Sequence, residues 1–308
     1  MLISVIINCY NGAIFLRRAI ESVLSQGYKH FEIIVFDNCS TDESASIVEN
    51  YLDSRIRLVS SELPEVVPLY MARNKAVIHA RGSVLCFLDC DDLMLPGRLE
   101  LMAEVFEKKD VDWLCTAYLK YSDEQREFSL HRQKNSGRIV SPGDLIERYN
   151  VGILTCGYRK KVFELLKFNS ELTIIGDFIF NVACAAMFKG LYVEVPTAIY
   201  MEHGNNLSLT RKELWASELR KVSDLIAPMH ESRRPIAKWP VTLGLRCKAL
   251  SYYLDAVNPE SRALIITKAF IALCSNHSSL AIRAFVVLIL PKKILLFVKT
   301  FLGRKEIS

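Results

Sequence analysis

The first hundred residues alternate between strand-like and helix-like segments, and this alternation restricts the fold more than any other feature. Apolar, β-branched runs typical of buried strands cover residues 2–8, 31–36, 56–59 and 83–88. Helical patterns lie between them at residues 16–24, 40–51 and 68–80, the second opened by a capping box at Ser40 and Glu43. Such alternation predicts an α/β fold, with a mostly parallel sheet covered by helices on both faces.

Polar residues follow three of these strands, at the edge of the sheet where ligands of such folds bind. They are Asn8-Cys9-Tyr10, Asp37-Asn38 and Asp89-Cys90-Asp91-Asp92. Three carboxylates directly after a buried strand repel one another and are costly to desolvate unless a cation neutralises them. Their oxygens suit Mg²⁺ or Mn²⁺, which also bind phosphates. We predict a divalent metal site here; an acidic turn that only caps the strand is the alternative.

The neighbouring residues suit a nucleotide. Asp37 and Asn38 can hydrogen-bond the edge of a base and Tyr10 can stack on one, although capping and packing explain them too. Arg73, in the helix before the acidic cluster, can reach phosphates unless it is simply exposed. No G-x-G-x-x-G follows the first strand and no G-x-x-x-x-G-K-[ST] occurs, so a dinucleotide dehydrogenase and a P-loop nucleotidase are disfavoured.

Taken in order, these segments resemble the family 2 glycosyltransferases of the GT-A fold. The resembling residues are 4–11, 19–26, 32–42, 72–76, Gly82 and 87–92, and the likeness extends from residue 2 to about residue 210. It implies a Rossmann-like domain that transfers a sugar, with inversion and a divalent metal, from a nucleotide-sugar donor. UDP is the favoured nucleotide. Cys9 and Asn38 depart from the residues usual in the family, which leaves the base that is recognised open.

The resemblance also implies roles for single residues. The nucleotide would be bound by Cys9, Tyr10, Asn11, Asp37, Asn38, Arg73, Asn74 and Asp89. Asp91 would hold the metal on the diphosphate, and Asp92 would share this role or that of Asp89. Asp177, which opens an apolar helix, would be the catalytic base, with simple helix capping as the alternative. His203, in a loop like the closing loop of the family, would be a further metal or phosphate ligand.

After residue 95 the pattern becomes mixed. It predicts a helix at 96–108, an aromatic strand at 113–121, a polar loop at 122–137 and a helix at 178–188 that ends before Gly190. Charged residues and three prolines in 211–240 predict a domain boundary. We therefore expect a GT-A domain over residues 1–215 and a C-terminal helical region over residues 216–308.

The C-terminal region predicts contact with a membrane. Residues 262–302 are rich in Leu, Ile, Val and Phe, with basic residues between them, and the longest uninterrupted apolar stretch is too short to cross a bilayer. Ile294, Leu295, Val298 and Phe301 mark one face of a basic amphipathic helix, which would lie on an anionic membrane surface. Packing against the catalytic domain or in a dimer interface is the alternative.

Charge and cysteine content bear on location and partners. The nine cysteines form no CxxC pair, so we expect buried thiols in a reducing compartment. No signal-like segment precedes the first strand, so we expect a cytoplasmic protein that is peripheral on the inner face of the membrane. The net charge of +5 is modest, and we expect no nucleic-acid partner. The expected partners are a nucleotide-sugar donor and a glycan or lipid-linked acceptor. The oligomeric state stays open.

Two other functions stay open from the sequence. A sugar nucleotidyltransferase also combines an α/β nucleotide fold with a metal, but it usually needs a Gly- and Arg-rich loop after the first strand, which residues 8–12 do not provide. A non-catalytic membrane scaffold with the same fold would tolerate the loss of Asp91.

Overall fold

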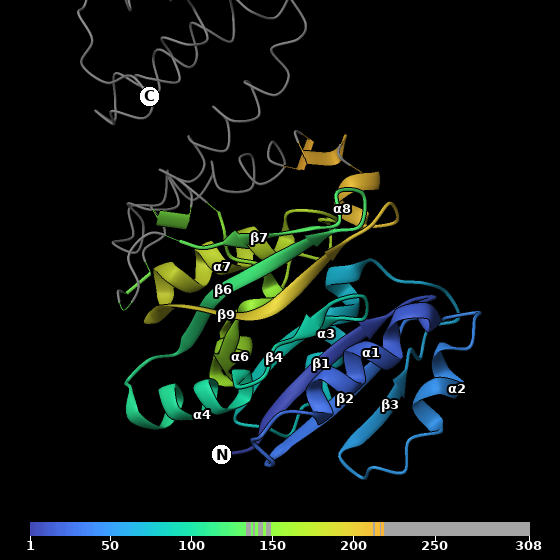
Figure 1. Ribbon diagram of the computed structural model, residues 1–308, viewed down its shortest axis with the longest axis horizontal. Coiled ribbons are helices and arrows are strands. Elements are labelled where there is room, and N and C mark those ends of the chain that lie inside the picture. Colours follow the sequence, from blue (N-terminus) through green and yellow to red (C-terminus); the bar gives the residue numbers. More distant parts are fainter. Residues whose placement is uncertain are drawn as a thin grey trace, which may run out of the picture. The chain divides into compact units, whose positions relative to one another are not determined.

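The computed structural model describes residues 1–133, 137, 139–140, 144–145, 149–211, 213–215 and 217–218 (Figure 1). One compact unit spans Met1–Arg211. The expected amphipathic helix and nearly all of the region 216–308 lie outside the described residues. The contact with a membrane and the domain boundary at 215/216 therefore stay predictions. Within the described part of the chain, no helix combines the length and the apolar character that a membrane span requires.

The first half of the unit is the predicted α/β alternation. The strands are β1 (Ile3–Cys9), β2 (Phe31–Asp37), β3 (Ile56–Ser60) and β4 (Val84–Asp89), and the helices are α1 (Ala13–Leu24), α2 (Ser44–Glu49) and α3 (Leu69–Ile78). The strands lie side by side in the order β3-β2-β1-β4, and all three of these pairings are parallel. The prediction of a parallel α/β sheet is confirmed.

Helices cover both faces of this sheet (Figure 1), because both sets of alternating side chains on its strands are apolar. On one face, Val5, Val35 and Cys86 belong to a buried cluster that includes Leu16 and Ile20 of α1. The other face carries aromatic rings. There Phe87 of β4 packs edge-on against Tyr158, Phe163 and Phe168. The core thus lies in two layers, one on each side of the strands.

The second half extends the sheet with antiparallel and parallel partners. Its elements are β5 (Leu93–Met94), α4 (Arg98–Lys108), β6 (Trp113–Ser122), β7 (Glu127–His131), η1 (Ile153–Thr155), β8 (Gly157–Arg159), α6 (Lys161–Leu165), α7 (Gly176–Met187), β9 (Gly190–Glu202) and α8 (Leu207–Thr210). Strand β8 lies antiparallel between β4 and β6, and the long β9 runs parallel to β6. The path along the sheet is β3-β2-β1-β4-β8-β6-β9-β5, with β7 paired to β6.

Two local predictions are wrong. The polar loop expected at 122–137 contains β7, a short strand whose residues are mostly exposed. The capping box is also wrong, because α2 begins at Ser44 with no side-chain cap, and the Ser40 hydroxyl instead accepts a hydrogen bond from the Asn11 backbone N–H. Ser40 ties two loops together and does not start the helix.

Candidate active site

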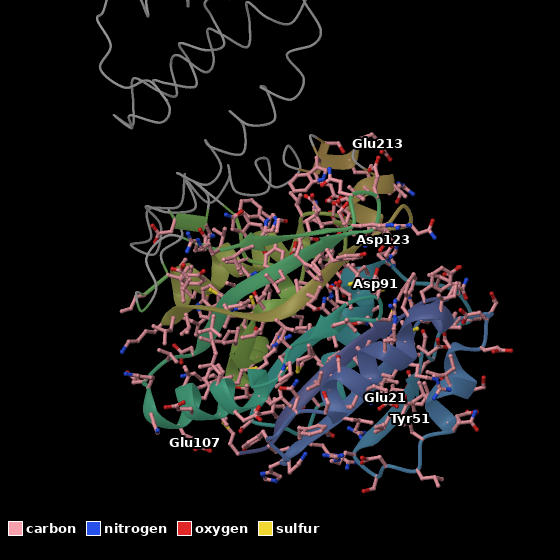
Figure 2. All side chains as sticks on the ribbon, in the orientation of Figure 1. Glu21, Tyr51, Asp91, Glu107, Asp123 and Glu213 are labelled. Carbon is pink, nitrogen blue, oxygen red and sulfur yellow. The ribbon has the colours of Figure 1, made fainter. Side chains whose placement is uncertain are left out.

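The carboxyl ends of β2, β1 and β4 meet at one edge of the sheet. The register pairs Cys9 with Asp37 across β1 and β2, and Asn8 with Asp89 across β1 and β4. The end of β1 is therefore flanked by a carboxylate on each side. Figure 2 shows Asp91, just beyond β4, at this edge, far from Glu107 at the other end of the sheet.

The loops that follow β1 and β2 are locked to each other. The Asn11 carboxamide oxygen accepts a hydrogen bond of 2.8 Å from the Thr41 N–H, and the Ser40 N–H donates to the Asp37 carboxylate at 3.3 Å. Asn11 has a φ of +51°, a left-handed conformation that asparagine tolerates better than most residues. Asn11 therefore supports this edge through its own loop. Tyr10 beside it is half exposed, so its ring face is accessible to a base.

Asn8 carries a stronger indication of a bound group. It is buried at the end of β1, and neither polar atom of its side chain has a hydrogen-bond partner among the described residues. Buried amides in native proteins are almost always paired, either with protein or with a bound molecule. Because register partners point to the same face, the Asn8 amide shares a face with Asp89. From the sequence Asn8 could be placed at this edge, but no role in binding was predicted for it.

Two expected nucleotide contacts are corrected by the structure. The Asn38 amide donates to the Val67 carbonyl at 2.8 Å and accepts from the Val67 N–H at 3.1 Å. The Asn74 amide pairs in the same way with the backbone of Phe168. Because each amide already uses both of its ends on main chain, both residues hold segments in place, and we leave them out of the nucleotide site.

Arg73 lies inside the protein, behind the strand ends. Its side chain is 3% exposed, lies over the rings of Tyr70, Phe87 and Phe168, and donates to Asp89 at 2.5 Å. Burial opposes the charge, but the Asp89 carboxylate together with Tyr70 and Asp177 outweighs it and raises the pKa of Arg73. The arginine therefore stays charged and orients Asp89, which is one third exposed. The alternative of simple surface exposure is therefore wrong, and contact of Arg73 with the nucleotide stays a prediction.

Asp91 is held by the loop that follows β9. Both donors among the described residues reach the same carboxylate oxygen, with Nε2 of His203 at 3.1 Å and Nδ2 of Asn206 at 3.4 Å from Oδ2. The Asn205 N–H donates to Nδ1 of His203, so the imidazole hydrogen sits on Nε2 and points to Asp91. Phe15 of α1 stacks on the same imidazole, with ring centroids 4.7 Å apart. His203 thus orients Asp91 and leaves Oδ1 for a ligand.

Asp92 is held by main chain through one of its two carboxylate oxygens. It is buried, and its Oδ1 accepts a hydrogen bond of 2.9 Å from the Met201 N–H, which ties the acidic loop to β9. Burial, followed by the charge of Asp91, raises its pKa well above the usual range. Its Oδ2 is buried and has no hydrogen-bond partner among the described residues, so a share of Asp92 in the metal site stays a prediction.

The acidic edge is compatible with Mn²⁺ or Mg²⁺. No cluster of three or more His, Cys, Asp or Glu side chains in the described part of the chain forms a metal site by itself. These ions, however, commonly use one or two carboxylates and complete their shell with phosphates and water. Burial and then the charge of Asp89 raise the pKa of Asp91, so a nearby cation would be stabilised by the negative charge of this edge. Asp91 is the residue that fits this ion.

The thiols of Cys9 and Cys90 face each other at the same edge. Both sulfurs lie beside Gly12, at 2.9 and 2.8 Å from where a β-carbon would stand. A hydrogen bond from Cys90 lowers the pKa of Cys9, although burial acts in the opposite direction. The seven cysteines of the described residues are all free thiols, five of them buried, in agreement with the expectation of buried thiols. Gly12 is required here because a side chain would displace this pair.

Asp177 stands at the start of α7, on the aromatic side of the sheet. Its Oδ1 accepts from the Phe178 N–H at 2.8 Å and from the Tyr70 hydroxyl at 3.3 Å, and its Oδ2 accepts from the Tyr149 hydroxyl at 3.3 Å. Burial raises its pKa. Helix α3 joins this carboxylate to the strand ends, because Tyr70 contacts Asp177 and Arg73, one turn further on, contacts Asp89.

The sequence analysis missed the residues around Asp177. Tyr70 and Tyr149 come from distant segments, so no local pattern marks them. Asn181 did carry a signal: with Asp177 it is one of two polar side chains in an otherwise apolar helix, and a spacing of four places both on one face.

Comparison with known proteins identifies the family. Residues 4–167, just over half of the chain, match the family described as Glycosyl transferase family 2. The chain belongs to this family. Over 156 residues it is 30% identical to the Escherichia coli UDP-Glc:alpha-D-GlcNAc-diphosphoundecaprenol beta-1,3-glucosyltransferase WfgD. The matched segment covers 51% of this chain and 56% of WfgD. The chain spans 46%, 63% and 56% of the length of the first three curated relatives it matches.

Solved structures identify the fold as GT-A. The S. aureus TarS fragment in complex with UDP-GlcNAc superposes with a TM-score of 0.69 at 17% identity, covering 96% of this chain and 83% of that one. The mannosyltransferase PcManGT from Pyrobaculum calidifontis, in complex with GDP-Man and Mn²⁺, superposes with a TM-score of 0.50 at 17% identity over 92% of this chain and 86% of that one. The expectation of a GT-A fold is confirmed.

Proposed function

We propose that this protein is an inverting glycosyltransferase that moves a sugar from a nucleotide-sugar donor to a hydroxyl of a glycan acceptor. The observation that carries the proposal is the meeting of strand ends at one edge, with Asp37 and Asp89 on either side of β1 and Asp91 beyond them. A sheet edge of this kind binds nucleotides in α/β folds, because it offers polar groups from several strands at one place.

The nucleotide would be held by Tyr10, Asp37, Asp89 and the unpaired amide of Asn8, with Cys9 beneath it. UDP is the favoured nucleotide, since WfgD is named for UDP-Glc and TarS was solved with UDP-GlcNAc. Mn²⁺ or Mg²⁺ would be held by Asp91. When bound, such an ion stabilises the negative charge that develops on the departing diphosphate.

Asp177 is the proposed catalytic base. It would take the proton of the acceptor hydroxyl while that oxygen attacks C1 of the sugar and the bond from C1 to the diphosphate breaks. A single displacement inverts the anomeric configuration, so an α-linked donor gives a β-linked product. Burial raises the pKa of Asp177, which makes its carboxylate a stronger base than an exposed aspartate.

The acceptor is proposed to be a lipid-linked glycan of a cell-surface polysaccharide. The name of WfgD specifies a sugar on diphosphoundecaprenol as the acceptor and a beta linkage in the product. The basic, apolar residues 262–302 would bring this chain to an anionic membrane that carries such a lipid. A location on the inner face of the membrane follows from the same proposal.

The proposal is tested by incubating the full chain with a panel of nucleotide sugars, a lipid-diphosphate-linked sugar and Mn²⁺. We expect release of the nucleoside diphosphate, a product of inverted configuration by NMR, and no transfer in excess EDTA. Release of pyrophosphate would instead indicate a sugar nucleotidyltransferase. Absence of both transfer and donor hydrolysis with every donor would favour a non-catalytic scaffold.

Two variants separate the proposed roles. Asp177→Asn should reduce turnover by about 10² to 10⁴-fold while donor binding, measured as Mn²⁺-dependent thermal stabilisation, is retained. Asp91→Asn should lose the Mn²⁺-dependent part of that stabilisation. Asp110→Asn is the matched control, because this carboxylate is fully exposed and pairs only with Lys189 at 3.2 Å among the described residues. Wild-type turnover in Asp177→Asn would contradict the assignment of the base.

A further inference from the structure

A chain of buried hydrogen bonds ends on the carboxylate of Asp177. The hydroxyl of Tyr158 donates to Oδ1 of Asn181 at 2.5 Å, Nδ2 of Asn181 donates to the hydroxyl oxygen of Tyr149 at 3.0 Å, and the Tyr149 hydroxyl reaches Oδ2 of Asp177 at 3.3 Å. Tyr158 and Asn181 are fully buried. Tyr149 thus bridges Asp177 and Asn181, two residues one turn apart on the same face of α7.

The direction of every bond in this chain is determined by chemistry. The Asn181 amide nitrogen can only donate, so the Tyr149 oxygen is the acceptor in that contact. The single proton of Tyr149 is then left for Asp177. Burial, followed by the charge of Asp177, raises the pKa of Tyr149 well above its usual value, so this proton is present throughout the neutral range. Each donor therefore points toward the carboxylate.

We propose that Tyr149, oriented by Asn181, is a positioning residue that keeps Asp177 ionised and fixes the orientation of its carboxylate for the reacting hydroxyl. The inference rests on the proposed function, in which Asp177 is the base. A hydrogen bond to the charged form of a carboxylate favours that form, and it opposes the effect of burial. Oδ1 already accepts from the Phe178 N–H and the Tyr70 hydroxyl, so Oδ2, with Tyr149 as its one donor among the described residues, is the oxygen with a lone pair left for the proton of a substrate.

Tyr70 is the natural comparison for Tyr149. Its hydroxyl lies 2.9 Å from the Ile174 carbonyl and 3.3 Å from Oδ1 of Asp177, so its one proton is shared and favours the nearer carbonyl. Tyr149 has no such competing acceptor among the described residues. The two tyrosines are similarly distant from the carboxylate, but only Tyr149 is committed to it.

Other charges also act on Asp177 and set the background for any titration. Arg73 of α3, the Phe178 N–H and a hydrogen bond from Tyr70 lower its pKa, and Asp89 of β4 raises it, while Tyr118 and Cys156 are further titratable groups in electrostatic contact with it. None of these groups is altered by removing the Tyr149 hydroxyl, so a shift in that variant reports the hydrogen bond.

The test measures the pKa of Asp177 directly in the metal-free full chain. The side-chain carboxyl carbon is followed by ¹³C NMR against pH, and its signal is assigned by its absence in Asp177→Asn. We expect Tyr149→Phe to raise the pKa by about one unit, since the charged carboxylate loses a hydrogen bond and this bond, at 3.3 Å, is long. Asn181→Leu should shift it in the same direction by less, because the Tyr149 hydroxyl then loses its orientation.

Matched variants make the outcome specific. Tyr51→Phe removes a hydroxyl that bonds Glu21 at 2.8 Å on the far side of the unit, where Figure 2 shows the two side chains together, and it should leave the pKa unchanged. Tyr70→Phe should shift the pKa less than Tyr149→Phe. With an active donor and acceptor, the apparent pKa of the acid limb of log kcat against pH should also rise by about one unit in Tyr149→Phe. The KM for the donor should be unchanged.

Two results would overturn the inference: an unchanged pKa of Asp177 in both Tyr149→Phe and Asn181→Leu, or equal shifts in Tyr149→Phe and Tyr70→Phe. Failure of the proposed function looks different. In that case Asp177→Asn turns over like the wild type, whatever the pKa measured for Asp177.

Discussion

The ion pair of Arg73 and Asp89 should respond very unequally to the loss of its two partners. Arg73 is 3% exposed and Asp89 is 32% exposed. Asp89→Asn leaves a buried cation without its counter-ion, and breaking a buried pair in this way costs about 3–5 kcal/mol of unfolding free energy. We expect the lower end, about 3 kcal/mol, because water reaches the carboxylate side. Arg73→Met leaves a carboxylate that water can solvate and places an apolar chain among aromatic rings, so its cost should stay below about 1.5 kcal/mol.

Urea unfolding of the full chain at pH 7 measures this difference, followed by tryptophan fluorescence, to which the buried Trp113 contributes. The double variant should be as stable as Arg73→Met alone, since neither charge of this pair remains. Asp53→Asn is the control: its bond to Arg55 is 2.6 Å long but both side chains are near 30% exposed, so the loss should be below about 1 kcal/mol. Equal costs for Asp89→Asn and Arg73→Met would refute the reasoning.

Two further predictions concern stability. Gly12→Ala should cost about 1–3 kcal/mol, because the new β-carbon would lie within 3 Å of two sulfurs, whereas Gly204→Ala, with open space around it, should change the denaturation midpoint very little. Glu32 accepts from Ser4, Arg81 and Arg57, and although burial acts against it these bonds lower its pKa below 4.5. The stabilisation of the folded state by ionised Glu32 is therefore complete above pH 4.5. It is lost as the pH falls through the lowered pKa of Glu32. Glu32→Gln should thus be less stable than the wild type by about 1–3 kcal/mol at pH 7, with a gap that closes on acidification in a pH series of thermal melts. A constant gap would argue against an ionised Glu32.

The first half of the fold could be predicted because its strands are buried on both faces. Such strands are continuous apolar runs, as in β1 and β2, where all seven residues of each are buried. The strands of the second half lack this signal. Strand β7 is mostly exposed, β8 has three residues, and β9 mixes buried and exposed positions, so pairing with β6 determines them more than their own composition does.

The candidate site was predicted in outline and corrected in detail. Asp37, Asp89 and Asp91 meet at one edge because they follow parallel strands, which the sequence reveals. The orientation of a side chain is not revealed in this way. Asn38 turns to the backbone of Val67 and Asp92 to that of Met201, although each stands in a motif next to a residue that faces the site.

The sequence by itself determined the parallel sheet and the set of polar residues at its edge, because strand burial and strand ends are properties of neighbouring residues. Only the tertiary structure decided which of those residues are free to bind a ligand. That decision depends on partners far away in the chain: His203 reaches Asp91 across 112 positions, and Tyr70 reaches Asp177 across 107. A polar side chain binds a ligand only when no such partner has already used its hydrogen bonds, and this is settled by packing.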